Sequence, residues 1–503
     1  MLSKTLDSFS PLKDRTVLRR DALASLVVFL VALPLCVGIA VASGVPAELG
    51  LVTGIVGGLV VGLLPGSSLQ VSGPAAGLTV LVYDAVQHFG LGPLGAIVLV
   101  SGLLQVGLGL ARLGRWFRAI SLAVVQGMLA GIGLVLVLGQ LYALADAEQP
   151  SGGIAKLTGL PGLAGAVAGG GTALTAFAVG AGTIAVLLLW PRLPAAVRVV
   201  PGPLAAVAMA TCVTVLLDLP VAEVRVQGLL EAVDPPGAGD FQQLAGVAAI
   251  GTVLAFTLIA SAESLFSAAA VDRMHDGART HYDKELMAQG AGNMVCGTLG
   301  ALPMTAVIVR SATNVQAGAK TPLSRVLHGL WLLLFTAALP AVIAVIPLAA
   351  LAGVLVHAGC KLIPVKDLLP LWHRHRGEAV ILVVTALAVV FTDLFEGVLL
   401  GLLLAVVKTA WEVSHIHVEI LERTDARLVV SITGNATFLR LPPVLDQLEK
   451  LPRDRAVELD LSQLRHLDHA CRVALESWAV WHNGSRPEPM TVRHPAPTGN
   501  AVR

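Results

Sequence analysis

Long stretches without charged residues make up most of this chain. Six of them contain no Asp, Glu, Lys or Arg, and each exceeds the roughly 20 apolar residues that a helix needs to cross a bilayer. They cover residues 22–47, 49–83, 85–111, 119–145, 157–191 and 326–360. Because the longest stretches exceed one span, they have to hold more than one element. The pattern predicts a protein that crosses a membrane many times.

Glycine, proline and charged residues split these stretches into about fourteen membrane elements. The third and tenth elements are notably short. The predicted bounds are 22–43, 47–64, 74–89, 92–111, 118–143, 171–190, 199–217, 243–271, 285–299, 307–318, 322–340, 344–360, 378–392 and 394–411.

The composition excludes most classes of soluble protein. Hydrophobic residues make up 55% of the chain and charged residues 13%, whereas a typical soluble protein carries about a quarter charged residues. The net charge of +1 identifies no partner, and nothing indicates nucleic acid. Five cysteines without a CxxC pair argue against a disulfide framework or a zinc site. We therefore predict no metal and no cofactor.

The distribution of Lys and Arg orients the elements. With the N-terminus in the cytoplasm, nineteen basic residues fall on the inner side and only Lys156 and Arg225 fall outside. Twelve more, from Lys408 onward, also lie inside, and Arg310 falls within the membrane. We predict a multi-pass protein of the cell (inner) membrane with both termini cytoplasmic. The first element is expected to be retained, although residues 41–43 weakly resemble a signal-cleavage site.

The two ends of the chain differ from its middle. Residues 1–21 are predicted to form a cytoplasmic N-terminal arm, and residues 22–411 a transmembrane domain. Residues 412–503 alternate strand-like and helix-like runs, which is typical of a small α/β domain. The strand-like runs are 417–421, 428–433 and 457–461, and the helix-like runs are 441–451 and 471–481.

Two interrupted segments indicate an internal duplication. Gln70–Gly77 opens the third element, and Leu302–Ser311 opens the tenth about 235 residues later. The chain then divides into two seven-element repeats, about 22–217 and 243–411, and the odd number of elements makes the second repeat inverted. Short segments interrupted by Gly or Pro at matching positions of two halves indicate a transport site at the membrane midplane. The alternative is a pair of ordinary kinks.

Broken elements inside a membrane favour anions for a physical reason. Non-helical backbone is tolerated there only where it lines a cavity or is covered by protein. A half-helix that begins at such a place presents free N–H groups and the positive end of its dipole. Pro74 is expected in the first turn of its half-helix, where a missing N–H costs nothing. Arg310 would add a fixed positive charge; its alternative role is a structural ion pair with a carboxylate.

Ionisable residues inside a bilayer are rare and usually functional. Glu263 of the eighth element could face the anion, take up a proton and couple proton movement to substrate movement. The alternative is a carboxylate at the cytoplasmic end of that element. Asp272 and Asp276 could hold magnesium in a membrane enzyme, but in a loop they are more typical of solvated charge. No P-loop lysine, HExxH or GxSxG motif is present, so we do not predict an enzyme.

Several motifs, in order along nearly the whole chain, resemble one known family. They are Ala32–Leu35 with Ile39–Pro46, Gln70–Pro74, Ala262–Leu265, Lys284–Leu286 with Gln289, Gly290 and Asn293, and Arg310–Asn314 followed by Gly318–Pro322. With them the sequence resembles the SulP anion permeases (solute carrier family 26), of the bacterial type with a C-terminal STAS domain.

The resemblance implies two inverted seven-segment repeats, divided into a core and a gate domain that move like an elevator. It also implies a homodimer and a cytoplasmic STAS domain with an unidentified partner. The anion site is expected between the half-helices of the third and tenth segments, bordered by the first and eighth. Carried over to this sequence, the substrate-binding residues are Leu35, Ile39, Pro74, Ala75, Ala76, Glu263, Arg310, Ser311 and Ala312.

Two features depart from the family pattern. The anti-sigma-factor antagonists that STAS domains resemble carry a phosphorylatable serine just after an Asp, whereas this chain has Asp468–Cys471 there. A phosphoserine switch is therefore not expected. Leu35 and Ile39 are apolar where several relatives place a polar or aromatic residue. The identity of the substrate is therefore the family property that can least be carried over to this sequence.

We therefore expect secondary active transport by proton symport. The expected substrate is a small anion, namely a dicarboxylate such as fumarate, bicarbonate or sulfate, and the apolar border slightly favours an organic carboxylate. The alternatives are a passive anion channel and a nucleobase–proton symporter of the same architecture. Arg310 and the STAS-like tail argue against the nucleobase symporter.

Overall fold

The protein divides into two units, Met1–Leu402 and Leu403–Arg503, which hold most contacts within themselves. Of the predicted N-terminal arm, residues 1–14 lie outside the described residues, and Arg15–Asp21 already belong to the first helix. The computed structural model describes residues 15–115, 121–150, 152–194, 196–197, 200–225, 228–229, 231–392, 394–422, 427–452, 455–484 and 492–493.

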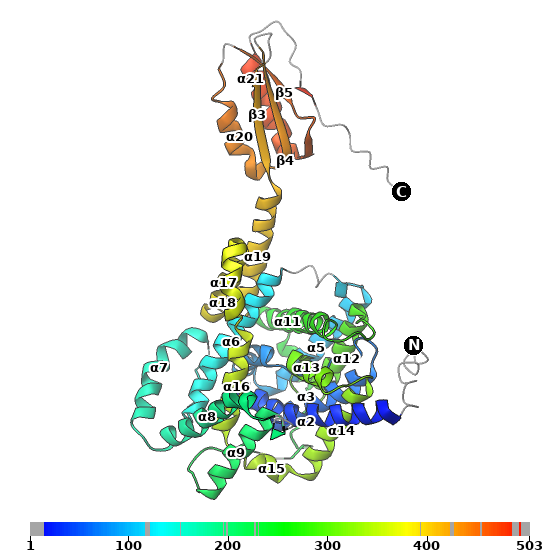
Figure 1. Ribbon diagram of the computed structural model, residues 1–503, viewed down its shortest axis with the longest axis vertical. Helices are drawn as coiled ribbons and strands as arrows, with labels where there is room; N and C mark the ends of the chain where they lie inside the picture. Colours follow the sequence, from blue (N-terminus) through cyan, green and yellow to red (C-terminus); the bar gives the residue numbers. More distant parts are fainter. Residues whose placement is uncertain are drawn as a thin grey trace. The chain divides into compact units, whose positions relative to one another are not determined.

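The first unit is mainly helical, and each predicted membrane element coincides with a helix to within several residues (Figure 1). Uncharged apolar runs explain why these segments become helices, since a helix satisfies all its backbone groups internally. Within the described residues, six helices are long and apolar enough to cross a membrane. In chain order the matching elements are α2 (Arg15–Ala42), α3 (Ala47–Val56) with the π-helical turn η2 (Gly57–Val61), the 3-10 turn η3 (Ala76–Leu78) with α4 (Thr79–Phe89), α5 (Leu91–Leu110), α6 (Leu122–Leu144), α8 (Thr172–Leu189), α9 (Gly202–Leu216), α11 (Val247–Val271), α12 (Tyr282–Thr298), α13 (Ile308–Gln316), α14 (Leu323–Ala338), α16 (Leu348–Leu362), α18 (Arg376–Phe391) and α19 (Leu394–Val413).

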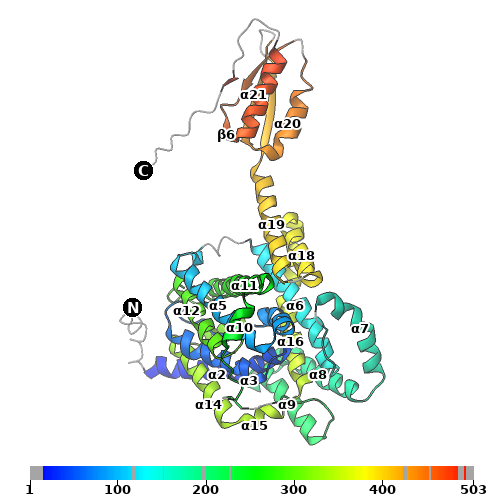
Figure 2. The same cartoon turned by 180° about the vertical axis from the view of Figure 1, so that it is seen from behind.

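Two helices that the sequence pattern did not predict occupy the same place in each half. Helix α7 (Gly153–Ala168) follows α6, and α17 (Val365–Arg374) follows α16. Helix α6 packs against α18, and α16 packs in the same way against α8. Helices α7 and α8 lie side by side in both views (Figure 2). Residues 144–170 had the pattern of a connection because Lys156, Pro161 and several glycines interrupt their apolar run.

The membrane unit is not purely helical, which corrects the all-α prediction. Strand β1 (Ser72–Pro74) pairs antiparallel with β2 (Met304–Ala306), with Ser72 opposite Ala306. The N–H of Val307 donates to the oxygen of Val71 at 2.9 Å and extends the pair. The two interrupted segments thus satisfy each other's backbone groups, as burial away from water requires.

Glycines let neighbouring elements approach this strand pair closely. A Cβ atom on Gly57 of η2 would overlap the carbonyl of Ser72, and one on Gly58 would overlap the backbone of Gly329 in α14. Larger side chains at either position would push β1 or α14 away. Gly57 therefore allows β1 to pack directly on η2, and Gly58 allows α14 to do the same.

The second unit is a small α/β fold whose core includes Val430, Ile432, Leu459 and Leu475. Its sheet has the order β3-β4-β5-β7, and β6 also pairs with β4. The β3–β4 pair is antiparallel and the β4–β5 pair parallel. The elements are β3 (Ile416–Glu422), β4 (Arg427–Ala436), α20 (Leu441–Leu448), β5 (Ala456–Asp460), β6 (Leu464–Leu467), α21 (His469–Asn483) and β7 (Val492–Arg493). The strand-like runs of the sequence match β3, β4 and β5 and the helix-like runs match α20 and α21, whereas β6 and β7 were not predicted.

Candidate functional site

The candidate site lies where the two interrupted segments cross. After β1 the chain enters η3 and α4, and after β2 it enters α13. The residues that precede these helices, Ala75 and Val307, are extended and carry no side-chain oxygen, so neither caps its helix with a side chain. The first N–H groups of a helix have no partner within it. Two helix N-termini therefore start near one another with donors available to an anion.

The predicted residues of the third element lie at the start of this arrangement. Pro74 is the last residue of β1, opposite Met304, so the prediction that it lies in the first turn of the half-helix is wrong. A residue without an N–H is tolerated at such a strand end. Ala75 is buried and extended, and the half-buried Ala76 begins η3. Small side chains thus surround the entry to this half-helix.

Leu35 and Ile39 of α2 form an apolar border beside that entry. Both are buried, and Ala76 packs against the same apolar cluster. Helix α2 also contacts β1 and α13. Leu35 and Ile39 therefore belong to the same apolar cluster as Ala76 of the third element.

Glu263 of α11 approaches the first half-helix from the side. A Cβ atom on Gly77 would lie 2.7 Å from each carboxylate oxygen of Glu263. The carboxylate also interacts with the side chain of Thr305 in β2. Its Oε2 atom is buried without a hydrogen-bond partner within the described residues. Glu263 lies eight residues before the end of α11, so it belongs to the crossing rather than to the following loop.

Arg310 of α13 connects the two interrupted segments. It is fully buried, and Nη2 donates to the carbonyl oxygen of Pro74 at 3.3 Å. The guanidinium also interacts with Cys36 of α2 and His328 of α14. Within the described residues, Nε and Nη1 have no hydrogen-bond partner. Its recorded hydrogen bond is therefore to backbone rather than to a carboxylate, and two donors remain for a ligand.

Ser311 and Ala312 have different surroundings from Arg310. The Ser311 hydroxyl accepts from the N–H of Val71 at 2.9 Å and donates to the oxygen of Val307 at 2.8 Å. This hydroxyl therefore ties α13 to the segment before β1. Ala312, one residue further, is half-buried. Ser311 thus positions α13.

Side chains of α11 and α12 hold both strands from behind. Gln289 Nε2 donates to Ser72 Oγ at 2.7 Å, and Asn293 Oδ1 accepts from the N–H of Met304 at 2.7 Å. The N–H of Ala306 donates to Ser264 Oγ at 3.2 Å. These residues were part of the family resemblance, but their role in fixing the strands could not be read from the sequence.

The sequence analysis missed a buried cation near the first half-helix. Lys156 of α7 is 2% exposed, and its Nζ lies 5.3 Å from the centroid of the Tyr83 ring in α4. It lines a small cavity with Thr79, whose buried Oγ1 has no partner within the described residues. Tyr83 donates to the oxygen of Gln149 at 2.8 Å and also lines an adjacent cavity of about 560 Å³. Lys156 was one of only two basic residues assigned outside, which is the signal that could have identified it.

Comparisons with known proteins can be set beside this geometry. Residues 18–385 match the model of the sulfate permease family. The bicarbonate transporter BicA of Picosynechococcus sp. is 26% identical and covers 92% of this chain and 86% of its own length. The sodium-independent sulfate anion transporter of Bos taurus is 25% identical over 94% of this chain and 82% of its own. The murine anion transporter Slc26a9, solved in the inward-facing state, has the same fold, with a TM-score of 0.77 at 15% identity over 96% of this chain and 86% of its own.

Proposed function

The chain belongs to the sulfate permease family, and on this basis we propose that it is a secondary active transporter of a small anion. The resemblance to the SulP anion permeases is thereby confirmed. A permease family consists of transporters, so the prediction that the chain is not an enzyme is confirmed as well. The family match and the apolar helices together make it a multi-pass membrane protein.

One observation carries the proposed site. Two helices without side-chain caps begin at one crossing, and each has beside it a charged side chain with atoms that have no hydrogen-bond partner in the described part of the chain. An anion between η3 and α13 would receive N–H donors from both helices and lie near the free donors of Arg310. Arg is well suited to this because its planar donors match carboxylate, bicarbonate and sulfate oxygens. The small side chains of Pro74, Ala75 and Ala76 would leave room for the anion. Leu35 and Ile39 would form the apolar border of its site.

The proposed substrate is a dicarboxylate such as fumarate, bicarbonate or sulfate. Bicarbonate and sulfate also appear in the names of the two relatives. The apolar border formed by Leu35 and Ile39 gives a slight preference for an organic carboxylate, because a carbon skeleton would gain from burial there.

Glu263 is the proposed proton carrier. A carboxylate and an anion about 4 Å apart repel one another by about 4 kcal/mol at an effective dielectric constant of 20. Taking up a proton removes that repulsion, so binding of the anion and of the proton would favour each other. Proton symport follows from this coupling.

The movement and assembly that we propose follow the family. The two halves share a strand followed by a half-helix, and the packing of α6 on α18 resembles that of α16 on α8. These similarities support fourteen membrane segments in two inverted repeats, with core and gate domains that move like an elevator. We further propose a homodimer in the inner membrane with cytoplasmic termini. The second unit would be a STAS domain that binds an unidentified cytoplasmic partner.

Asp272 has a structural role that explains its presence without a metal. Its carboxylate accepts from the N–H and the hydroxyl of Thr280 and so closes the loop after α11. Asp276 is exposed. Replacing both with Asn should leave transport intact, whereas complete loss of transport would bring back the membrane enzyme.

The decisive experiment is uptake into proteoliposomes of labelled sulfate, bicarbonate and fumarate, each with and without an inward proton gradient. Saturable uptake of one anion that the gradient stimulates would support the symporter and identify the substrate. Uptake that ignores the gradient, together with large anion currents, would replace it with a passive channel. If none of the three enters, the anion assignment fails and labelled nucleobases are tested next.

A further inference from the structure

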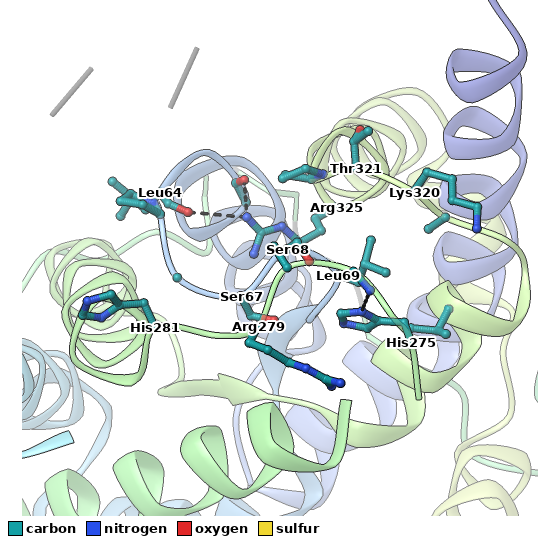
Figure 3. A pocket seen from close by; sticks show the side chains of 18 of the residues that line it. Leu64, Ser67, Ser68, Leu69, His275, Arg279, His281, Lys320, Thr321 and Arg325 are labelled. Carbon is teal, nitrogen blue, oxygen red and sulfur yellow. Dashed lines mark hydrogen bonds between the residues drawn. The ribbon is translucent and has the colours of Figure 1, made fainter. Parts of the chain in front are cut away.

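Another cavity lies at the end of the membrane unit that the charge pattern assigns to the cytoplasm. It measures about 840 Å³, within the range of small-molecule sites. Three connections form it, namely those from η2 to β1, from α11 to α12, and from α13 to α14. Figure 3 shows side chains of all three around one space, among them Ser68, Arg279 and Lys320. None of its lining residues belongs to the site between the half-helices.

Positive charge dominates the wall of this cavity. Arg279, Lys284, Lys320 and Arg325 line it, and Asp276 is the one carboxylate among its lining residues. Arg325 is balanced from behind by the buried Glu285, with which it interacts. Among the lining side chains the other three cations outnumber Asp276, while the carboxylates of Asp21 and Asp272 hold the backbone behind the wall.

Two buried groups at the wall lack protein partners. Arg325 is 3% exposed and holds the first connection, because Nη2 donates to the oxygen of Gly62 at 2.8 Å. Ser67 is 2% exposed, and its N–H donates to Glu285 Oε2 at 2.7 Å. Within the described residues, Arg325 Nε and Ser67 Oγ have no hydrogen-bond partner. Buried polar groups nearly always have partners, so these two indicate a ligand or ordered water.

The loops around the cavity are held in place without any ligand. Asp272 accepts from Arg279 through its backbone oxygen and from Thr280 through its carboxylate. On the opposite wall, Asp21 of α2 accepts from the N–H groups of Lys320, at 2.6 Å, and Thr321. Lys320 therefore extends from a backbone that Asp21 holds, and the Arg279 guanidinium is itself fixed against its loop, which lowers the cost of binding.

We propose that this cavity is a binding site for a phosphate monoester group, separate from the transport site. A phosphate monoester carries a charge of about −1.5 to −2 at pH 7, which suits a wall whose charged lining side chains are mainly basic. Its three terminal oxygens suit Arg and Lys donors together with a serine hydroxyl. The group could belong to a soluble phosphorylated compound or to the headgroup of an anionic lipid, because both present the same chemistry.

The position of the cavity also gives the ligand a route to the transport site, and this step rests on the proposed function. The connection that contains residues 62–69 leads into β1, and the connection at residues 317–322 directly follows α13. A ligand that bridges them restrains both segments that carry the half-helices. Binding is therefore expected to change the rate of transport without occupying the substrate site.

The test is thermal unfolding of the purified full-length protein in detergent, titrated with inorganic phosphate at constant ionic strength. A ligand that binds only the folded state raises the Tm in a saturable manner. We expect this rise in the wild type and at least a tenfold weaker apparent affinity in a double variant, Arg279→Gln with Lys320→Gln. Arg273→Gln is the matched control, because Arg273 is an exposed cation of the same loop that does not line the cavity.

A second set of variants separates this site from the transport site and from loss of folding. Ser68→Trp fills the cavity without changing its charge and should abolish the rise in Tm, while its Tm without phosphate shows that it folds. Arg310→Ala should keep the rise. An equal rise in the wild type and the double variant would overturn the proposal, and so would a rise lost only in Arg310→Ala.

Nanodiscs distinguish the two sources of phosphate. In phosphatidylcholine alone, soluble phosphate should raise the Tm of the wild type if the natural ligand is soluble. If the ligand is a lipid headgroup, added phosphatidic acid should raise the Tm and make soluble phosphate ineffective. Both results support the site, provided that Arg279→Gln with Lys320→Gln removes the effect. A wild type that responds to neither probe overturns it, whatever the outcome of the uptake experiment.

Discussion

The two interrupted segments have similar shapes but different chemistry. The first, at residues 74–77, offers Pro, Ala, Ala and Gly and no ionisable group. The second places Arg310 in the first turn of α13. Both charges of the crossing face the first segment, since Glu263 approaches Gly77 and Arg310 donates to Pro74. The first segment therefore supplies space and backbone donors, and its neighbours supply charge.

This difference teaches that equivalent positions of the two halves should respond differently to mutation. Changes in the first segment should act through steric conflict, and changes in the second through loss of charge.

Replacing Arg310 with Ala should weaken anion binding by roughly 10- to 150-fold, because a buried hydrogen bond to a charged group contributes about 1.5–3 kcal/mol. The measurement is the substrate concentration at half-maximal uptake in proteoliposomes. Arg310→Lys should recover part of the affinity, since it keeps the charge but not the planar donors. Arg273→Gln is the control for total charge. Unchanged affinity in Arg310→Ala would remove Arg310 from the site and abolish the proposed contrast.

Replacing Glu263 with Gln should remove stimulation by a proton gradient, about a tenfold loss of uptake under a gradient. Exchange of labelled for unlabelled anion across the membrane should continue, because Gln is similar in size and stays neutral as a protonated Glu does. The two assays are run on the same vesicles. Gradient stimulation equal to that of the wild type would assign proton coupling to another residue.

Replacing Gly77 with Ala should reduce uptake by about five- to tenfold, which corresponds to the lower end, about 1–1.4 kcal/mol, of the usual cost of overpacking. The added Cβ would lie 2.7 Å from both Glu263 oxygens. Gly165→Ala is the matched control, because a Cβ there meets no atom within 4 Å. Combining Gly77→Ala with Glu263→Gln should give a smaller loss than the product of the two single losses. Independent effects would contradict the contact.

Replacing Lys156 with Gln should lower uptake by about two- to fivefold at low substrate concentration, because a buried cation beside α4 attracts anions toward the first half-helix. The effect should shrink as the substrate approaches saturation, and Lys156→Arg should retain most of the activity. A variant with a normal initial rate at low substrate would limit Lys156 to a structural role.

The smallest effect on transport is expected from Asp468→Ala in the second unit, which provides a baseline. Asp468 caps α21 by accepting from the N–H of Cys471 at 2.7 Å, and loss of such a cap costs about 1 kcal/mol. The measurement is the Tm of the second unit within the full chain, and uptake should stay unchanged.

The stabilisation that Asp468 gives to α21 should depend on pH in a defined direction. Partial burial would raise the pKa of Asp468, but the N–H groups of Cys471 and Phe438 outweigh it and hold the pKa below its usual value. A carboxylate of this kind stabilises the fold above its ordinary pKa and ceases to do so as the pH falls through the lower, folded value. The difference in Tm between the wild type and Asp468→Ala should therefore be full above about pH 4, the ordinary value, and disappear only as the pH falls through the lower pKa of the folded state. A difference that persists in acid would mean that the charge is not what stabilises the cap.

The sequence predicted the helices well because uncharged runs of this length have few other stable structures. It failed for β1 and β2, since three residues are too short to show alternation and their pairing joins positions far apart in the chain. Helix α7 was missed because Lys156 resembled a loop residue. Its charge is buried beside Tyr83, which only tertiary packing determines.

The sequence indicated which residues belong to the candidate site, but it did not indicate which neighbours their side chains contact. Rarity of charge identified Glu263 and Arg310, and the interrupted pattern identified residues 74–76. That Arg310 donates to Pro74 and that the Ser311 hydroxyl already has two backbone partners depend on how the segments cross. A single sequence carries no local signal for either contact.

The pairing of Ser72 with Ala306 has a consequence for how the protein is made. About 230 residues separate these partners, so a ribosome adding 5–20 residues per second needs roughly 10 to 50 s between them. During that interval β1 lacks its partner strand. Its backbone N–H and C=O groups have to form hydrogen bonds with water or be covered by the insertion machinery or a chaperone. The site between the two half-helices therefore forms late in biogenesis. A chain truncated before residue 304 would keep β1 without its partner strand, and the exposed strand edge could pair with other chains.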